Sequence, residues 1–109
     1  MAVVVRRFAI YLVSLDPTVG SEMQKSRPAL VVSPDEMNKS IATVIIAPMT
    51  TRGRAYPTRV ACEFQGRHGE IALDQMRVVD KSRLVRQLGV LDAATQQLVL
   101  ETLAAMFAL

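Results

Sequence analysis

Short runs rich in valine, isoleucine, leucine and threonine alternate with clusters of proline, glycine, asparagine and aspartate along most of the chain. Short runs of this kind, bounded by turn-forming residues, are typical of β-strands. The pattern predicts five strands, at residues 10–15, 28–33, 43–49, 58–63 and 70–76. Because the strands follow one another closely, we expect a small antiparallel barrel or a curled sheet.

The segments between these runs carry residues that favour turns. PDEMN at 34–38 and RGRAYP at 52–57 are predicted to be connections rather than helices or strands. QGRHG at 65–69 contains two glycines, which can adopt positive φ, and it predicts a hairpin turn. LDPTVGSEMQKS at 15–26 has no hydrophobic periodicity. A loop of this length in a compact domain is usually functional or disordered, and here we expect a functional one.

The part of the chain after Gly89 predicts a C-terminal helix. Asp92 can cap it, and residues 93–109 contain no glycine or proline. The apolar residues that follow helical spacing are Leu98, Val99, Leu103, Met106 and Phe107. Three further leucines widen this stripe, namely Leu91, Leu100 and Leu109. The surplus indicates either a partner surface or a terminal helix that is deeply buried in a monomer.

The length of 109 residues predicts one domain, residues 1–109, of the α+β class and mainly β, with a core large enough to fold without disulfides. The only cysteine, Cys62, has no histidine beside it, so we interpret it as a buried bystander rather than a nucleophile. The N-terminal MAVVVRRFAIYLV lacks a cleavage pattern, and no apolar run reaches the ~20 residues that span a bilayer. We expect a cytoplasmic protein without a membrane segment.

The charged residues limit the chemistry. Ten of the thirteen basic residues are arginines, and the net charge is +3. Arginine suits bidentate phosphate contacts, so a phosphate-bearing partner is one interpretation and ordinary surface charge is the other. The single histidine, His68, cannot form a histidine pair and is expected to be solvated in its turn. The carboxylates lack H-E-x-x-H or EF-hand spacing, so the sequence predicts no metal site and no cofactor.

Three segments carry a family resemblance: LDPTVGSEMQKSRPALVVSP, IIAPMTTRGRAYPTRV and IALDQMRVVDKSRLVRQLG. Together they resemble the MazF/PemK family of toxin endoribonucleases from type II toxin–antitoxin systems, in family order over about residues 10–89. The resemblance implies a small SH3-like barrel with a C-terminal helix and a homodimer that cuts single-stranded RNA at short sequence motifs without a metal. It also implies a cognate antitoxin whose acidic, partly disordered tail blocks access of RNA.

The same resemblance implies catalytic residues. The loop after the first strand is expected to cover an RNA-binding groove, with Arg27 as the principal catalytic residue and Thr50 as its partner. Cleavage by the 2′-hydroxyl of RNA needs a proton acceptor, stabilisation of the phosphoryl charge and protonation of the departing oxygen. An arginine guanidinium stays protonated, so an acid or electrostatic role suits Arg27 better than a basic one. Glu22 is the candidate for a base or for a group that positions Arg27, and an exposed loop carboxylate is the alternative.

The family's groove-lining pair corresponds to Asp74 and Gln75. An amide such as that of Gln75 can both donate to and accept from a base edge, and Arg77 could pair with Asp74 or with a phosphate. A hydrogen-bond network at a strand end is the alternative for this segment, and a solvated charged loop is the alternative for the arginines that flank Gly53. The residues expected to bind RNA are Ser21, Lys25, Thr51, Arg52, Arg54, Asp74, Gln75 and Arg77.

The chain departs from the family at one point. The family usually has R-G-D or R-G-E before the first strand, whereas this chain has RRFAIYLV, so Phe8 and Ala9 stand where glycine and an acid are expected. We expect Phe8 to pack against the barrel rather than to stack on a base. Two other functions are compatible with the same fold: a gyrase poison like CcdB and a non-catalytic RNA-binding module. CcdB proteins act through C-terminal residues that include a tryptophan, and this chain has none.

Overall fold

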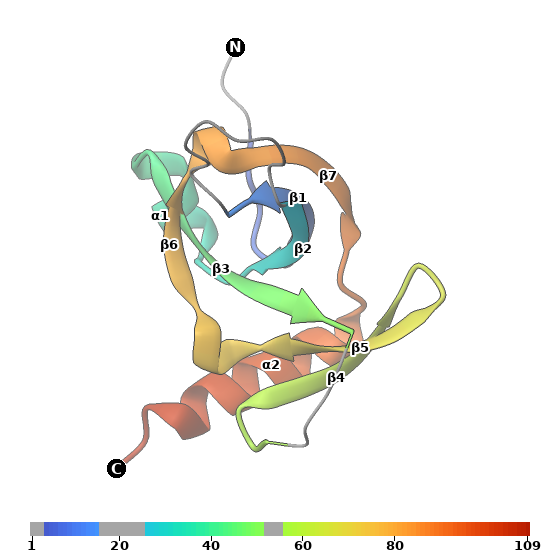
Figure 1. Ribbon diagram of the computed structural model, residues 1–109. Helices are drawn as coiled ribbons and strands as arrows, with labels where there is room; N and C mark the ends of the chain where they lie inside the picture. The colour runs from blue at the N-terminus through green and yellow to red at the C-terminus, as the bar shows by residue number, and fades with distance from the viewer. Residues whose placement is uncertain (1–3, 16–25, 52–55) are drawn as a thin grey trace.

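A curled antiparallel sheet and a C-terminal helix make up the computed structural model, which describes residues 4–15, 26–51 and 56–109 (Figure 1). The strands and helices of the described residues are β1 (Ala9–Ser14), β2 (Ser26–Val31), α1 (Asp35–Ser40), β3 (Thr43–Thr50), β4 (Arg59–Phe64), β5 (Arg67–Ala72), β6 (Arg77–Asp80), β7 (Leu84–Val90) and α2 (Ala93–Met106). Two short 3-10 turns, η1 (Leu73–Gln75) and η2 (Lys81–Arg83), flank β6. Neither described helix is long and apolar enough to cross a membrane.

The strand β3 organises the sheet. The strands follow one another in the order β4-β5-β3-β2-β1-β7, and β6 also pairs with β3. All of these pairs are antiparallel. The first half of β3 pairs with β6, opposite Val79, and its end pairs with β5, opposite Glu70. The sheet therefore curls around β3 (Figure 1). This confirms the expected mainly-β fold with a curled antiparallel sheet.

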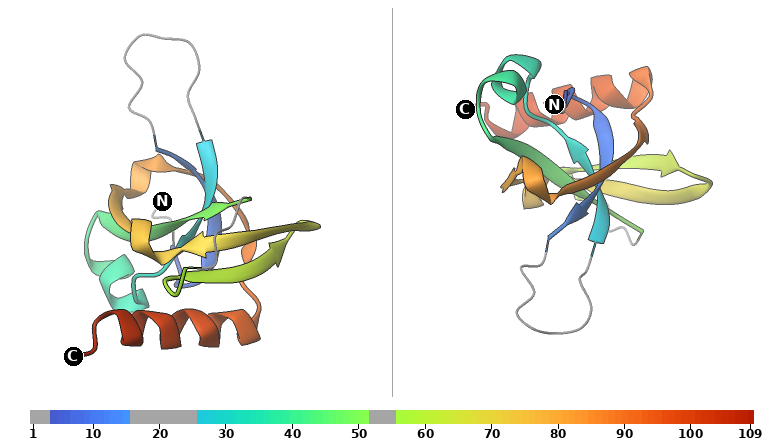
Figure 2. Two further views of the ribbon diagram at one scale, coloured as in Figure 1. Left: turned by 60° about the horizontal axis from the view of Figure 1, so that its bottom comes forward. Right: turned by 90° about the horizontal axis from the view of Figure 1, so that it is seen from above.

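Two apolar clusters lie on opposite faces of the curled strands, because successive side chains of a strand alternate between faces. The first cluster faces α2 and includes Ile10, Leu30, Ile71, Leu73 and Val99. The second joins β1, β2, β3 and β6 and includes Tyr11, Val13, Val31, Val44, Ile46 and Val79. Figure 2 shows α2 lying along one side of the sheet. Strands with apolar residues on both faces thus give this small domain two layers of core.

The helix α2 confirms the predicted C-terminal helix and corrects its buried face. Asp92 caps it by accepting a hydrogen bond from the Thr95 backbone N–H at 3.0 Å. Val99 is fully buried, and Leu100, Leu103 and Met106 pack against the first cluster. Two residues assigned to the same stripe point outward instead, since Leu98 is 50% exposed and Phe107 is 72% exposed.

One local expectation was wrong, and two others were right in kind but differ in their bounds. PDEMN was expected to be a connection, but it forms the start of α1, with Pro34 as the N-cap. The charges of Asp35 and Glu36 in the first turn and of Lys39 in the last turn interact favourably with the helix dipole. The hairpin turn is only two residues long, with Gln65 at φ 53° and Gly66 at φ 76°, so β5 begins at residue 67. The strand expected at 70–76 ends at residue 72, and β6 and β7 lie in a region where no strand was expected. These two strands are partly exposed and carry charged residues, which hides them from a hydrophobic pattern.

Phe8 packs against the barrel, as expected, in an unusual conformation. Its φ is 72°, a left-handed value that is unfavourable for a bulky side chain and natural for glycine. The residue is only 8% exposed and lies within the first cluster. Its backbone donates to Val31 at 2.8 Å and accepts from Leu91 at 2.9 Å. Burial and these two hydrogen bonds hold phenylalanine in a backbone conformation that favours glycine, the residue that the resemblance led us to expect here.

Candidate active site

Arg27 and Thr50 lie at neighbouring strand ends. Arg27 is exposed near the start of β2 and precedes a proline, which favours extended backbone. The β2–β3 register pairs Ala29 with Pro48, and continuing it by two residues places Arg27 opposite Thr50. Opposite residues of a sheet point to the same face. An open hollow of about 340 Å³ is lined by Arg27, Pro28, Met49, Thr50 and Thr51.

The next strand continues this row. Thr50 pairs directly with Glu70 of β5, so Arg27, Thr50 and Glu70 occupy one line across three strands. The approach of β5 to β3 is close at this point: a Cβ atom added to Gly69 would lie 2.2 Å from the Thr50 carbonyl oxygen. Gly69 is therefore required here for space. The extended β2–β3 register and the β3–β5 pairing thus assign a cation, a hydroxyl and a carboxylate to the same face of three neighbouring strands.

Arg59 of β4 holds two carboxylates beside this row. Its Nε donates to Asp74 Oδ1 at 2.7 Å and its Nη2 to Asp74 Oδ2 at 3.1 Å, while its Nη1 donates to Glu70 Oε1 at 3.4 Å. Thr58 adds a hydrogen bond to Asp74 at 3.1 Å, and the Tyr56 ring lies 5.2 Å from the guanidinium carbon. The bidentate contact lowers the pKa of Asp74 and raises that of Arg59, mainly through the hydrogen bonds that join them.

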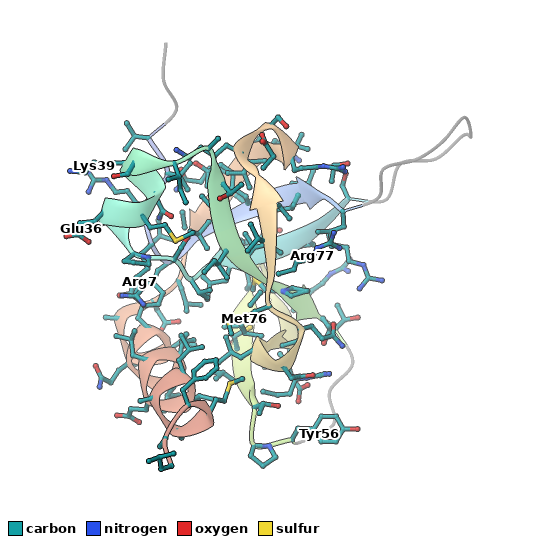
Figure 3. All side chains as sticks on the ribbon, turned by 90° about the vertical axis from the view of Figure 1, so that its left-hand side faces the viewer. Arg7, Glu36, Lys39, Tyr56, Met76 and Arg77 are labelled. Carbon is teal, nitrogen blue, oxygen red and sulfur yellow. The ribbon has the colours of Figure 1, made fainter. Side chains whose placement is uncertain are left out.

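The structure places the pair Asp74–Gln75 in η1, next to this ion-pair network. Both residues are exposed. Asp74 binds Arg59 and not Arg77, which leaves a phosphate contact as the alternative for Arg77. Arg77 begins β6 opposite Ile46, and its exposed side chain extends away from α2, whereas Met76 packs against the first cluster (Figure 3). The segment 74–77 is thus compatible with both alternatives, a hydrogen-bond network at a strand end and a lining of the RNA-binding groove.

The expected site residues fall into two groups. Of the described ones, Arg27, Thr50 and Thr51 line one hollow, whereas Asp74 and Gln75 lie in η1 and Arg77 begins β6 opposite Ile46. The others lie outside the described residues: Ser21, Glu22, Lys25, Arg52 and Arg54. Arg59, Gly69 and Glu70 were missed from the sequence. The signal that could have found the two charged residues is the exact length of the hairpin turn. A two-residue turn fixes the register of β4 against β5, and this register brings Arg59 and Glu70 close together.

Cys62 and His68 lie on the hairpin beside the row of Arg27, Thr50 and Glu70, and Thr50 lines the same hollow as they do. They contribute to a second hollow of about 400 Å³, which continues past Met49 and Thr51 toward Phe64 on the hairpin. Cys62 is half-buried, and burial raises the pKa of its thiol, which disfavours the thiolate. His68 is exposed, as expected. Within residues 4–15, 26–51 and 56–109, no group of three or more histidine, cysteine, aspartate or glutamate side chains is arranged to hold a metal ion.

Comparisons with known proteins agree on one family. The family described as "PemK-like, MazF-like toxin of type II toxin-antitoxin system" matches residues 6–107. Among solved structures, MazF from Deinococcus radiodurans in a MazE–MazF structure is 28% identical, with a TM-score of 0.80 and coverage of 96% of both chains. MazF alone from the same organism is 27% identical, with a TM-score of 0.79 and coverage of 99% of this chain and 100% of that one. An endoribonuclease from a mycobacterial species is 26% identical, with a TM-score of 0.76 and coverage of 94% and 89%.

Proposed function

Because the chain belongs to the PemK-like, MazF-like family of toxins of type II toxin–antitoxin systems, we propose that it is an endoribonuclease that cuts single-stranded RNA at short sequence motifs. A solved relative described as an endoribonuclease supports this activity. The observation that carries the proposal is the placement of Arg27 and Thr50 on one hollow at the end of β2 and β3. A cation beside a hydroxyl is suited to binding a phosphoryl group.

The proposed reaction is attack by the RNA's own 2′-hydroxyl on the adjacent phosphorus. The Arg27 guanidinium stabilises the charge that develops on the phosphoryl oxygens, and the Thr50 hydroxyl donates a hydrogen bond to one of them. The products are a 2′,3′-cyclic phosphate and a 5′-hydroxyl. Side chains alone carry out these steps, so the proposal requires no metal. Glu22 is proposed either to accept the 2′-hydroxyl proton or to position Arg27.

RNA recognition is proposed for the residues around this hollow. Gln75 is exposed in η1, where its amide is available to read a base edge. Asp74 is held by Arg59, so it would meet RNA as a fixed hydrogen-bond acceptor. Thr51 and Arg77 are exposed at the ends of neighbouring strands. Phosphate and base contacts are also proposed for Ser21, Lys25, Arg52 and Arg54, on the family resemblance alone.

The proposed partner is an antitoxin, and the proposed assembly is a homodimer in the cytoplasm. The solved MazE–MazF relative supports the antitoxin. We propose that the antitoxin uses an acidic, partly disordered tail, which suits a chain of net charge +3. Binding should then weaken, but persist, as the salt concentration rises. Light scattering of the chain alone tests the homodimer, and light scattering with the product of the neighbouring small gene tests the antitoxin. A strict monomer at micromolar concentration would contradict the homodimer.

Cleavage of a long mixed-sequence RNA tests the proposed function. The wild type should cut it at a recurring short motif, and Arg27→Ala should lower the rate by a factor of about a hundred or more with little change in RNA affinity. Arg86→Ala is the matched control, because it removes another exposed arginine, from β7, two strands away from β2. A wild-type protein that leaves the RNA intact would refute the proposed endoribonuclease activity. An Arg27→Ala variant that is folded and fully active would refute the role of Arg27.

A further inference from the structure

The carboxylate of Glu70 completes the row that starts at Arg27. Thr50 and Glu70 are direct antiparallel partners, and the Cβ atoms of such partners lie about 4.5–5.5 Å apart on one face. Arg27 lies on the other side of Thr50 in the continued register. A ribose-phosphate unit that contacts Thr50 is therefore flanked by a cation on β2 and a carboxylate on β5.

Glu70 is held in place by its surroundings. Its side chain is 13% exposed, and Arg59 donates to its Oε1 at 3.4 Å. Arg59 is itself fixed by the two shorter hydrogen bonds to Asp74. Gly69 allows the β5 backbone to approach Thr50 closely, which fixes the spacing between the two strands. Among the hydrogen bonds between described residues, Arg59 binds Oε1 of Glu70 and not Oε2, so one carboxylate oxygen is not held by the ion pair.

We propose that Glu70 is the general base of the RNA cleavage proposed above, and the inference rests on that function. The Glu70 carboxylate accepts the proton of the 2′-hydroxyl while the 2′-oxygen forms a bond to phosphorus. The bond from phosphorus to the 5′-oxygen breaks, and that oxygen takes a proton from water. Glu70 then returns its proton to solvent, so the reaction consumes no proton overall. Glu22 keeps the positioning of Arg27 as its role.

Two neighbouring carboxylates fit this role less well than Glu70. Asp74 has both oxygens bound by Arg59, and a carboxylate bound in this way is a weaker proton acceptor. Glu63 lies opposite His68 on the hairpin, beyond the end of β3, and is exposed. Glu70 alone among these three is a direct partner of Thr50. Its position beside Thr50 distinguishes it.

Single-turnover cleavage of a short RNA that contains the cut motif tests the proposal. Glu70→Gln keeps the side-chain shape and an oxygen that can accept from Arg59, but it cannot take a proton. We expect its rate constant to fall by about a hundredfold or more, as for removal of a general base, with RNA affinity retained. Glu63→Gln makes the same change of charge on the same hairpin and should cleave at the wild-type rate. Glu22→Gln, measured in parallel, compares the two candidate bases.

A second variant separates chemistry from structure. Glu70→Ala removes the carboxylate and leaves space, so added formate should restore its cleavage in proportion to the formate concentration, while Glu70→Gln should not respond. If the wild type cleaves RNA and Glu70→Gln matches it, or if formate restores Glu22→Ala instead of Glu70→Ala, Glu70 is not the base although the enzyme stands. If Glu70→Ala is unfolded by circular dichroism, the cleavage rate of Glu70→Gln decides; if Glu70→Gln is unfolded, formate rescue of Glu70→Ala decides. A wild type that cuts no RNA would overturn both proposals together.

Discussion

Replacing Gly69 by alanine should disturb the site through backbone contact alone. The added Cβ would lie 2.2 Å from the Thr50 carbonyl oxygen and 3.3 Å from the Thr50 carbonyl carbon. Both of these atoms are backbone, so no flexible side chain can move out of the way. The strands β3 and β5 must separate, and Thr50 must shift with them.

The structure gives the size of the effect. An ordinary contact begins at 3.4 Å, so the backbone has to give by about 1 Å. A displacement of about 1 Å at catalytic groups can lower a rate by about a hundredfold. Overpacking of this kind typically costs about 1–3 kcal/mol of unfolding free energy. We therefore expect Gly69→Ala to remain folded with a lower melting temperature and to lose most of its RNA cleavage.

Gly66→Ala is the matched control for this change. Gly66 lies in the same hairpin with nothing within 4 Å of its added Cβ, but its φ of 76° is unfavourable for alanine, at a cost of about 1 kcal/mol. Melting temperature and single-turnover cleavage should be measured for both variants. Gly66→Ala should lose stability and keep its rate. A folded Gly69→Ala that cleaves at the wild-type rate would refute the argument that this contact positions Thr50.

Three further changes have definite expected outcomes. Thr50→Ala should slow cleavage less than Arg27→Ala, since it removes one neutral hydrogen bond rather than a charge; equal losses in a cleavage assay would contradict this. The folded-state pKa of Asp74 is lowered by Arg59, so this pair stabilises the fold at neutral pH and loses its effect as the pH falls below about 4. Melting curves of Asp74→Asn should therefore lie below wild type at pH 7 and approach it in acid, and a constant difference would refute the linkage. Phe8→Gly relieves a left-handed backbone but empties a buried site, so denaturant unfolding should show a net loss of about 2–3 kcal/mol, and a gain would show that strain outweighs burial.

The hydrophobic pattern predicted the strands that have strong apolar runs. The strands β1 to β4 and the helix α2 are all close to their expected positions, because each carries apolar residues into a core. The pattern did not predict β6 because that strand is short, and it did not predict β7 because that strand carries arginine and glutamine at exposed positions. α1 escaped because only one of its residues, Asn38, is buried, so its sequence has no apolar stripe.

The candidate site was predictable in part. Arg27 and Thr50 came from the family resemblance, and the register explains why two residues so far apart in sequence share one hollow. Arg59 and Glu70 are ordinary charged residues in sequence, and their importance appears only when the two-residue turn sets the hairpin register. Gly69 resembled a turn residue, but its role is close approach between strands. Pairing across strands is a non-local property that local patterns do not encode.

The chemical nature of the RNA ends tests the central claim most directly. The wild type should be incubated with a long RNA in excess chelator, and the ends of the fragments should be identified by mass spectrometry. The proposed reaction predicts undiminished cleavage, with a 2′,3′-cyclic phosphate on one fragment and a 5′-hydroxyl on the other, because the attacking group is the RNA's own 2′-hydroxyl. Fragments with 5′-phosphates, or cleavage that requires added Mg²⁺, would contradict it.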